Sequence, residues 1–177
     1  MAKTMKFIAL TTALMTIIFA LLYKFTDRDI LLTFAITFGT IAYHFIMRLI
    51  IGGIIDLIMK NKADYTKRWY RVGETEMKFY KKIGVKKWKN KMPTYNNDFF
   101  DTNKHSWDEI IWAMCQSELV HEIIIVFSFL PIIATVWFGA FWVFVITSVC
   151  AAISDMIFVF MQRFNRSRIL KMKTKLK

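Results

Sequence analysis

The sequence is poor in the residues that build disulfide or thiolate sites, since its 177 residues include only two cysteines and two prolines. Cys115 and Cys150 are far apart and neither belongs to a CxxC pair, so we expect neither a disulfide framework nor a thiolate metal site. Acidic residues are also scarce, with 13 Asp and Glu against 25 Lys and Arg. Apolar residues make up 56% of the chain, which exceeds the usual share in a soluble domain of this size. The composition indicates one compact integral membrane protein.

Uncharged runs predict where the chain crosses a membrane. Residues 7–23 are close to the shortest run that spans a bilayer, and they end without a small-x-small cleavage signal. We therefore expect a retained first span rather than a signal peptide. A polar turn at residues 26–29 separates this run from residues 30–59, which are long enough to cross a bilayer and project beyond it.

The second half of the chain contains an apolar stretch that is too long for one span. We expect one span at residues 119–137 and another at residues 140–160, with a turn near Gly139. Pro131 predicts a kink in the first of these two, because proline removes a backbone donor from a helix. The isolated Asp155 in the last span is expected to meet Arg163 or Arg48.

Lysine and arginine placement predicts the orientation of these spans. Nearly all of the basic residues fall in the N-terminal tail, between residues 60 and 104, or after residue 160. Four spans would bring these three regions to one face, and the positive-inside rule makes that face cytoplasmic. The prediction is an all-α multi-pass protein of the cell membrane. It has helix pairs at 1–59 and 118–161, a basic, largely helical cytoplasmic segment at 60–117, and a basic cytoplasmic tail at 162–177.

Lysines and arginines in residues 60–91 greatly outnumber Asp64, Glu74 and Glu76, and aromatic residues are interleaved with them. Basic residues with aromatics suit nucleic acid, but no recognised reader motif accompanies them, so we expect no nucleic-acid partner. Beside membrane spans, a cationic amphipathic segment is better explained as lying on an anionic inner leaflet, with its rings at headgroup depth.

Three ionisable residues, Glu118, His121 and Glu122, lie at the junction where the polar segment becomes membrane. On a continuous helix they occupy neighbouring faces. Ionisable groups at the edge of hydrocarbon are costly unless they pair or face a wet cavity, which suggests a site. The alternative is a polar cap whose side chains snorkel to the surface. We expect no metal here, because carboxylate-bridged metal sites usually need a second ExxH copy.

A polar stripe of His44, Arg48 and Asp56 interrupts the second apolar run, with Gly52 among them. One interpretation is an ion pair combined with a small residue that lets helices approach closely. The other is that the stripe faces the same cavity as His121. We favour the shared cavity, because an arginine inside a membrane usually has a function.

Three motifs then occur in order. They are residues 85–93 (Val-Lys-Lys-Trp-Lys-Asn-Lys-Met-Pro), residues 118–121 (Glu-Leu-Val-His) and residues 162–168 (Gln-Arg-Phe-Asn-Arg-Ser-Arg). The set resembles the glycosyl-4,4'-diaponeurosporenoate acyltransferase family, whose founding activity attaches a fatty acyl chain to a glycosylated carotenoid acid in staphyloxanthin synthesis. Ser167 stands where the family pattern has proline, Glu122 where the pigment enzyme has tryptophan, and Ala113 where it has glutamate. These departures leave the acceptor open.

The resemblance implies acyl transfer to a hydroxyl of a lipophilic acceptor, a glycosylated terpenoid or a lipid, from an activated acyl donor at the inner leaflet. Such a reaction needs a base and positive charge for the oxyanion. His121 is the natural base, and Glu118, one turn away, is expected to orient it. No cofactor is expected. The remaining candidate substrate-binding residues are Gln162, Arg163, Asn165, Arg166, Lys87, Trp88, Lys89, His44 and Arg48.

The sequence contains neither an HxxxxD motif nor a GxSxG elbow. A non-enzymatic role, as a lipid-binding or scaffold subunit, is therefore the alternative. In that case Trp88 and its neighbouring lysines would anchor the segment, and Glu118 and Arg166 would form an ion pair that locks the spans. The donor, the acceptor and any homo-oligomer stay open.

The charge asymmetry generates a topology prediction. Single cysteines at Asn96 and Thr174 should resist an impermeant thiol reagent in intact cells, and one at Asp27 should react, because only the turn between the first two spans would face outward. Labelling is read on the purified protein. Reaction of the Asn96 cysteine from outside would contradict the four-span topology.

Overall fold

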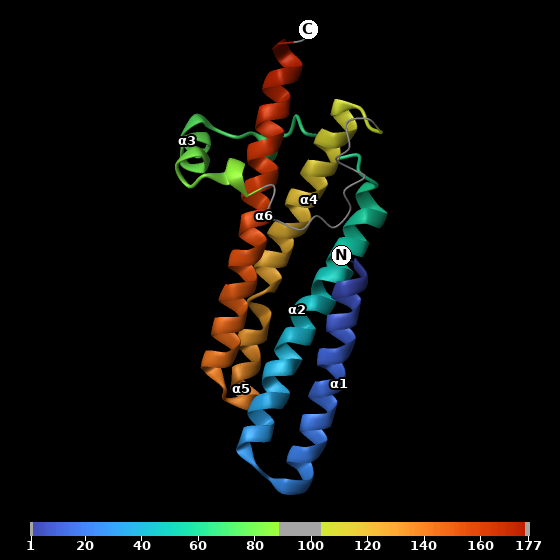
Figure 1. Ribbon diagram of the computed structural model, residues 1–177, viewed down its shortest axis with the longest axis vertical. Coiled ribbons are helices and arrows are strands. Elements are labelled where there is room, and N and C mark those ends of the chain that lie inside the picture. The colour runs from blue at the N-terminus through green and yellow to red at the C-terminus, as the bar shows by residue number, and fades with distance from the viewer. Residues whose placement is uncertain (1, 89–103, 176–177) are drawn as a thin grey trace. The chain divides into compact units, whose positions relative to one another are not determined.

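The computed structural model describes residues 2–88 and 104–175, and within them all regular structure is helical (Figure 1). The long helices are α1 (Ala2–Thr26), α2 (Asp29–Met59), α4 (Trp107–Phe127) and α6 (Phe141–Lys175). The short ones are η1 (Arg68–Tyr70), α3 (Glu74–Lys82), η2 (Val85–Lys87), η4 (Leu130–Ala134) and α5 (Thr135–Phe138).

Four helical segments are long and apolar enough to cross a membrane, which confirms the predicted fold class and indicates a membrane protein. They are Lys3–Thr26, Asp29–Met59, Trp107–Phe138 and Phe141–Thr174. The last two extend beyond the expected spans at their polar ends, because the helices continue past the point where the uncharged run stops. The chain forms two compact units. Unit 1 comprises residue 1 with residues 53–122 and 155–177, and unit 2 comprises residues 2–52 and 123–154.

In unit 2, α1 and α2 form a helical hairpin (Figure 1). Asp27 makes the turn with a φ of 50°, as the polar residues at this position predict. The hairpin packs closely: Phe19 lies 5.2 Å from Phe34 between ring centroids, and a Cβ added to Gly39 would lie 3.3 Å from a methyl carbon of Thr16. Even a methyl group at position 39 would therefore require Thr16 to shift by a few tenths of an ångström.

The predicted kink and turn in the second apolar stretch are both present in unit 2. α4 ends at Phe127, and the 3₁₀ helix η4 follows with Pro131 in its first turn. Gly139 then ends α5 with a φ of 70°, a positive value that glycine adopts readily because it has no Cβ. The hydroxyl of Tyr43 donates a 2.9 Å hydrogen bond to the carbonyl of Phe127, which satisfies one group freed at the end of α4.

Much of the apolar surface of unit 2 is exposed, as a lipid-facing surface requires. Leu10, Val136 and Trp137 are each more than 70% exposed. An exposed apolar surface of this kind marks contact with a membrane or another protein.

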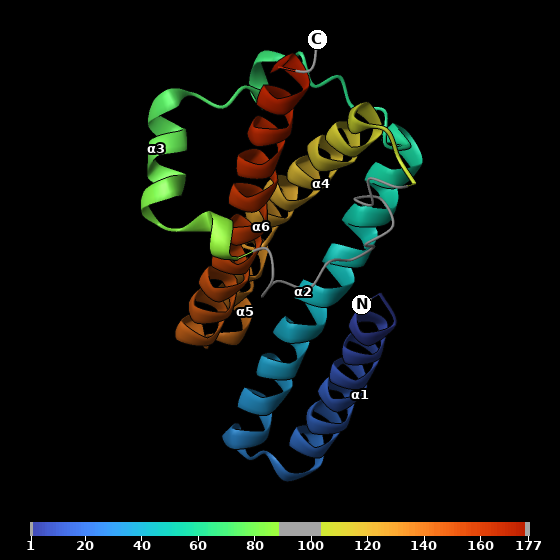
Figure 2. The ribbon, with the colours of Figure 1, turned by 45° about the horizontal axis from the view of Figure 1, so that its top comes forward.

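In unit 1 the basic segment is helical in short pieces, and it packs on α6 (Figures 1 and 2). Met77 and Tyr80 of α3 form a buried cluster with Met161 and Phe164 of α6. Val85 of η2 completes the cluster. Gly84, with a φ of 74°, makes the turn between α3 and η2. The segment is thus held by apolar contacts.

A second buried cluster of unit 1 joins the start of the basic segment to α4. It contains Ala63, Tyr70, Ile111 and Cys115, and Leu170 of α6 packs against it. Tyr70, in η1, is thereby fixed beside both long helices.

Candidate active site

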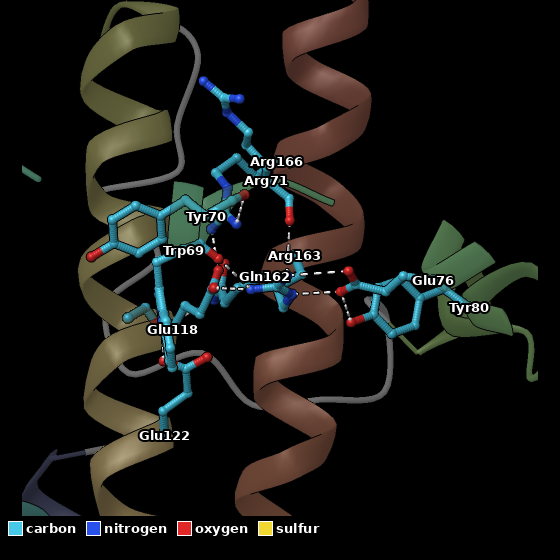
Figure 3. Close-up of polar contacts among 11 residues, drawn as sticks. Trp69, Tyr70, Arg71, Glu76, Tyr80, Glu118, Glu122, Gln162, Arg163 and Arg166 are labelled. Carbon is cyan, nitrogen blue, oxygen red and sulfur yellow. Dashed lines mark hydrogen bonds and ion pairs between the residues drawn. The ribbon is translucent and has the colours of Figure 1, made fainter. Parts of the chain in front are cut away.

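Glu118 of α4 is completely buried and binds two arginines of α6 (Figure 3). Its Oε1 accepts a 2.6 Å hydrogen bond from Arg163, and its Oε2 accepts one from Arg166. A buried carboxylate is tolerated only when it is paired and hydrogen-bonded, and here both oxygens are occupied. Glu118 therefore joins α4 to α6 in unit 1.

Arg163 extends this ion pair to α3. Its Nε and one terminal nitrogen contact the two carboxylate oxygens of Glu76 at 2.5 and 3.1 Å, a bidentate geometry. Its terminal nitrogens also donate to the backbone carbonyls of Trp69 and Arg71, at 3.2 and 3.1 Å. One guanidinium thus holds α3, α4 and the η1 segment, which comprises η1 and the following Arg71, to α6.

Arg166 is completely buried and adds a third contact to the η1 segment. It donates a 2.7 Å hydrogen bond to the carbonyl of Tyr70, and its guanidinium carbon lies 5.2 Å from the centre of the Tyr70 ring. Successive carbonyls from Trp69 to Arg71 are therefore all bound by the two arginines (Figure 3).

Two groups at the α3 end of this network have shifted pKa values. Burial raises the pKa of Glu76, but hydrogen bonds from Arg163 and Tyr80 and the charge of Arg163 outweigh it, so that the net pKa is lowered. Glu76 is therefore ionised at neutral pH. Burial and the 2.5 Å hydrogen bond to Glu76 raise the pKa of Tyr80, which stays a hydrogen-bond donor.

His121 lies one turn after Glu118, and its partner is Asp155 of α6. Its Nδ1 lies 2.8 Å from Oδ1 of Asp155, and its ring stacks on Phe158 with centroids 4.7 Å apart and planes 6° from parallel. Asp155 and Phe158 lie three residues apart and share one face of α6. The His121 side chain is 21% exposed.

This geometry corrects the expected pairing of Glu118 with His121. Both Glu118 oxygens are bound to arginines, and the carboxylate in contact with His121 belongs to Asp155. Asp155 is thus the carboxylate placed beside the imidazole, and its expected contact with Arg163 or Arg48 stays a prediction. The sequence offered one signal for it, because a lone carboxylate in an apolar run needs a partner.

The other predicted substrate-binding residues of unit 1 lie in different environments. Gln162 donates a 3.3 Å hydrogen bond to Ser117, beside Glu118. Asn165 is half-buried, and its side chain makes no hydrogen bond within the described residues. Trp88 packs against the apolar cluster of α3, η2 and α6, whereas Lys87 is exposed. Lys89 lies outside the described residues.

His44 and Arg48 belong to unit 2. His44 is buried, and its backbone carbonyl accepts a 2.9 Å hydrogen bond from Arg48. Arg48 also donates to the carbonyl of Ala151, at 3.4 Å. Asp56, the third residue of the predicted stripe, belongs to unit 1 and accepts a 3.1 Å hydrogen bond from Gln116.

Sequence reasoning missed several residues that the structure adds to the site. Trp69 donates a 2.8 Å hydrogen bond to Glu122, which gives this carboxylate a partner one turn after Glu118. Glu76 and Tyr70 are also site residues that the sequence did not predict. Their role depends on packing between segments far apart in the chain, and no local spacing reveals it. Within the described residues, no group of three His, Cys, Asp or Glu is placed to hold a metal ion.

Residues 62–175, more than half of the sequence, match the glycosyl-4,4'-diaponeurosporenoate acyltransferase family. The chain belongs to this family. No curated protein and no solved structure matches it. The matched region contains the His121–Asp155 pair and the arginine network, whereas His44 and Arg48 lie outside it.

The buried ion pairs generate a stability prediction. Glu118→Gln should destabilise the protein by about 3–5 kcal/mol, because it leaves a buried guanidinium uncompensated. Arg166→Met should cost a similar amount. The double variant should be more stable than the sum of the single losses predicts, since it removes both charges together. Denaturant unfolding of the purified protein in detergent measures all four states.

Glu122→Gln is the matched control, because it changes a carboxylate one turn away that accepts a hydrogen bond from an exposed tryptophan. Its expected cost is below about 1 kcal/mol. Strict additivity of Glu118→Gln and Arg166→Met would contradict a direct energetic coupling.

Proposed function

We propose that this protein is a membrane-embedded acyltransferase that moves a fatty acyl chain onto a hydroxyl of a lipophilic acceptor, with His121 as the general base. The observation that carries the proposal is the His121–Asp155 contact of 2.8 Å, within the region that matches an acyltransferase family. The acceptor is a glycosylated terpenoid or a lipid. The acyl group comes from an activated donor.

In the proposed reaction, Nε2 of His121 removes the proton of the acceptor hydroxyl as its oxygen attacks the acyl carbonyl. The tetrahedral intermediate then collapses, the bond to the donor breaks, and the imidazolium returns the proton to the leaving group. Water is not consumed. The enzyme regains its starting protonation state after each transfer.

Asp155 positions the base. When its carboxylate accepts the Nδ1 proton, Nε2 is left as the basic nitrogen, and the imidazolium formed during transfer is stabilised. Phe158 restricts the ring from its flat side. Glu118 acts further away, by tying α4 to α6 and so keeping His121 opposite Asp155.

The positive-inside rule supports a cell-membrane orientation with both termini and the basic segment in the cytoplasm. The exposed face of the segment suits an anionic inner leaflet. Lys78, Lys81 and Lys82 of α3 are exposed, as are the rings of Phe79 and Trp69. Acyl donors would then reach the site from the cytoplasmic side.

The arginine network also favours the alternative, a scaffold or lipid-binding subunit, because Glu118 and Arg166 do form the expected ion pair. In a scaffold or lipid-binding subunit, His121 would have no chemical role. A substitution at His121 would remove the activity of an enzyme, whereas it would lower the abundance of a scaffold.

The catalytic prediction follows from this difference. His121→Gln keeps the size of the side chain but cannot take a proton near neutral pH. It should lower acyl transfer by about 10²–10⁴-fold while the protein accumulates normally in the membrane. Lipid profiling of cells that express wild type or variant measures the acylated product, and immunoblotting measures abundance.

Asp155→Asn keeps a hydrogen-bonding group but no longer stabilises the imidazolium, so it should lower activity and shift the pH profile of what remains. A fully active His121→Gln protein would exclude the base role. Loss of abundance without loss of activity per molecule would favour the scaffold.

A separate prediction concerns the basic segment. A peptide of residues 60–91 should bind vesicles that contain anionic lipid and should dissociate as salt rises, because surface attraction is screened beyond about 10 Å at 0.1 M salt. Cosedimentation measures binding, and zwitterionic vesicles are the control. Binding that depends on neither the salt concentration nor the lipid charge would contradict an electrostatic role.

A further inference from the structure

A pocket of about 380 Å³ lies in unit 1 between the η1 segment and the C-terminal part of α6. It falls within the size range of small-molecule sites, and it has room for about a dozen waters at ~30 Å³ each. A ligand larger than a single ion therefore fits. His121 and Asp155 are not among the lining residues.

The lining residues of the pocket include three cations, Arg71, Arg166 and Lys171, and no carboxylate. Arg71 and Lys171 are exposed, and within the described residues their side chains have no acidic partner. The neighbouring Lys173, by contrast, is paired with Asp108. Arg166 is balanced by Glu118, so the uncompensated positive charge of the pocket comes from Arg71 and Lys171.

The uncharged lining also suits a polar ligand. Burial raises the pKa of Tyr70 to about 12, so that its phenol keeps its proton at neutral pH. Ser167 adds a hydroxyl, and Val72 and Leu170 supply apolar surface. Hydroxyl donors among cations are typical of anion recognition.

Arg166 lines the pocket from a completely buried position. Its terminal nitrogens bind Glu118 and the carbonyl of Tyr70, and its Nε is enclosed without a hydrogen-bond partner within the described residues. The charge that a ligand can reach therefore comes from Arg71 and Lys171.

We propose that this pocket binds the phosphate of the acyl donor. The assignment rests on the proposed acyl transfer and adds the chemistry of its donor. Activated fatty acyl groups are carried by phosphopantetheine thioesters or by phospholipids, and both carriers contain a phosphate. Guanidinium and ammonium groups are the usual protein partners of phosphate.

The spacing along α6 favours the phosphopantetheine arm. At 1.5 Å of rise per residue, Arg166 lies roughly 16 Å and Lys171 roughly 24 Å along the helix from Asp155. A long flexible arm can place a thioester near His121 while its phosphate stays in the pocket. In a glycerophospholipid the ester lies only a few atoms from the phosphate, which is too short for this separation.

Equilibrium dialysis of the full-length protein, in nanodiscs of zwitterionic lipid, tests the assignment with two pairs of labelled probes. The first pair is 4'-phosphopantetheine and pantetheine, and the second is glycerol 3-phosphate and glycerol. Members of each pair differ by the phosphate alone. We expect 4'-phosphopantetheine to bind at least about tenfold more tightly than pantetheine, the effect of one charge-assisted contact.

Arg71→Gln and Lys171→Gln should each weaken binding of the phosphorylated probe by about tenfold and leave pantetheine unchanged. Arg71→Gln keeps the backbone carbonyl that Arg163 binds, so that the η1 segment stays attached. Lys81→Gln is the matched control, because Lys81 is an exposed lysine of α3 outside the pocket lining. Thermal unfolding confirms that each variant is folded.

A phosphate preference in the second pair alone, lost in both variants, would keep the phosphate site and overturn the phosphopantetheine assignment. Equal binding within both pairs, or unchanged binding in Arg71→Gln and Lys171→Gln, would overturn the site itself. Dialysis requires no acyl transfer. Failure of the proposed function, seen as an active His121→Gln protein, is therefore distinguishable from failure of this site.

Discussion

The buried charge of Glu118 is the constraint on which the rest of unit 1 depends. A carboxylate with no exposed surface must be balanced, and Arg163 and Arg166 balance it from α6. Their remaining donors then need acceptors, which Glu76 and the η1 carbonyls supply. One buried charge thus determines where two other segments lie.

The candidate catalytic pair uses the same two helices as this network. On α6, Asp155, Phe158 and Gln162 recur at a spacing of three or four residues and so form one stripe, which Arg166 continues. On α4, Ser117 and His121 are also four residues apart, and they contact this stripe at Gln162 and Asp155. Sliding one helix by a turn would therefore break the ion pairs and separate His121 from Asp155.

Hydropathy and turn residues predicted the spans, the turn at Gly139 and the break near Pro131, because those features depend on local composition. The interaction partners of individual charged residues were harder to predict from the sequence. Glu118 was assigned to His121 because the two are near neighbours in sequence, but the arginines that bind Glu118 are more than 40 residues away in the chain. Trp88, taken as a substrate residue, packs in an apolar cluster, because a motif does not distinguish a contact with substrate from a contact with the core.

Arg166 illustrates how closely structure and binding are combined in this chain. It neutralises Glu118, holds the carbonyl of Tyr70 and lines the cationic pocket. Replacing it would change folding and ligand contact at once, so lost activity in such a variant identifies neither role. Arg71 and Lys171 contribute charge to the pocket from exposed positions, where no buried partner depends on them. The chemistry of the pocket can therefore be separated from the stability of the fold only at these outer cations.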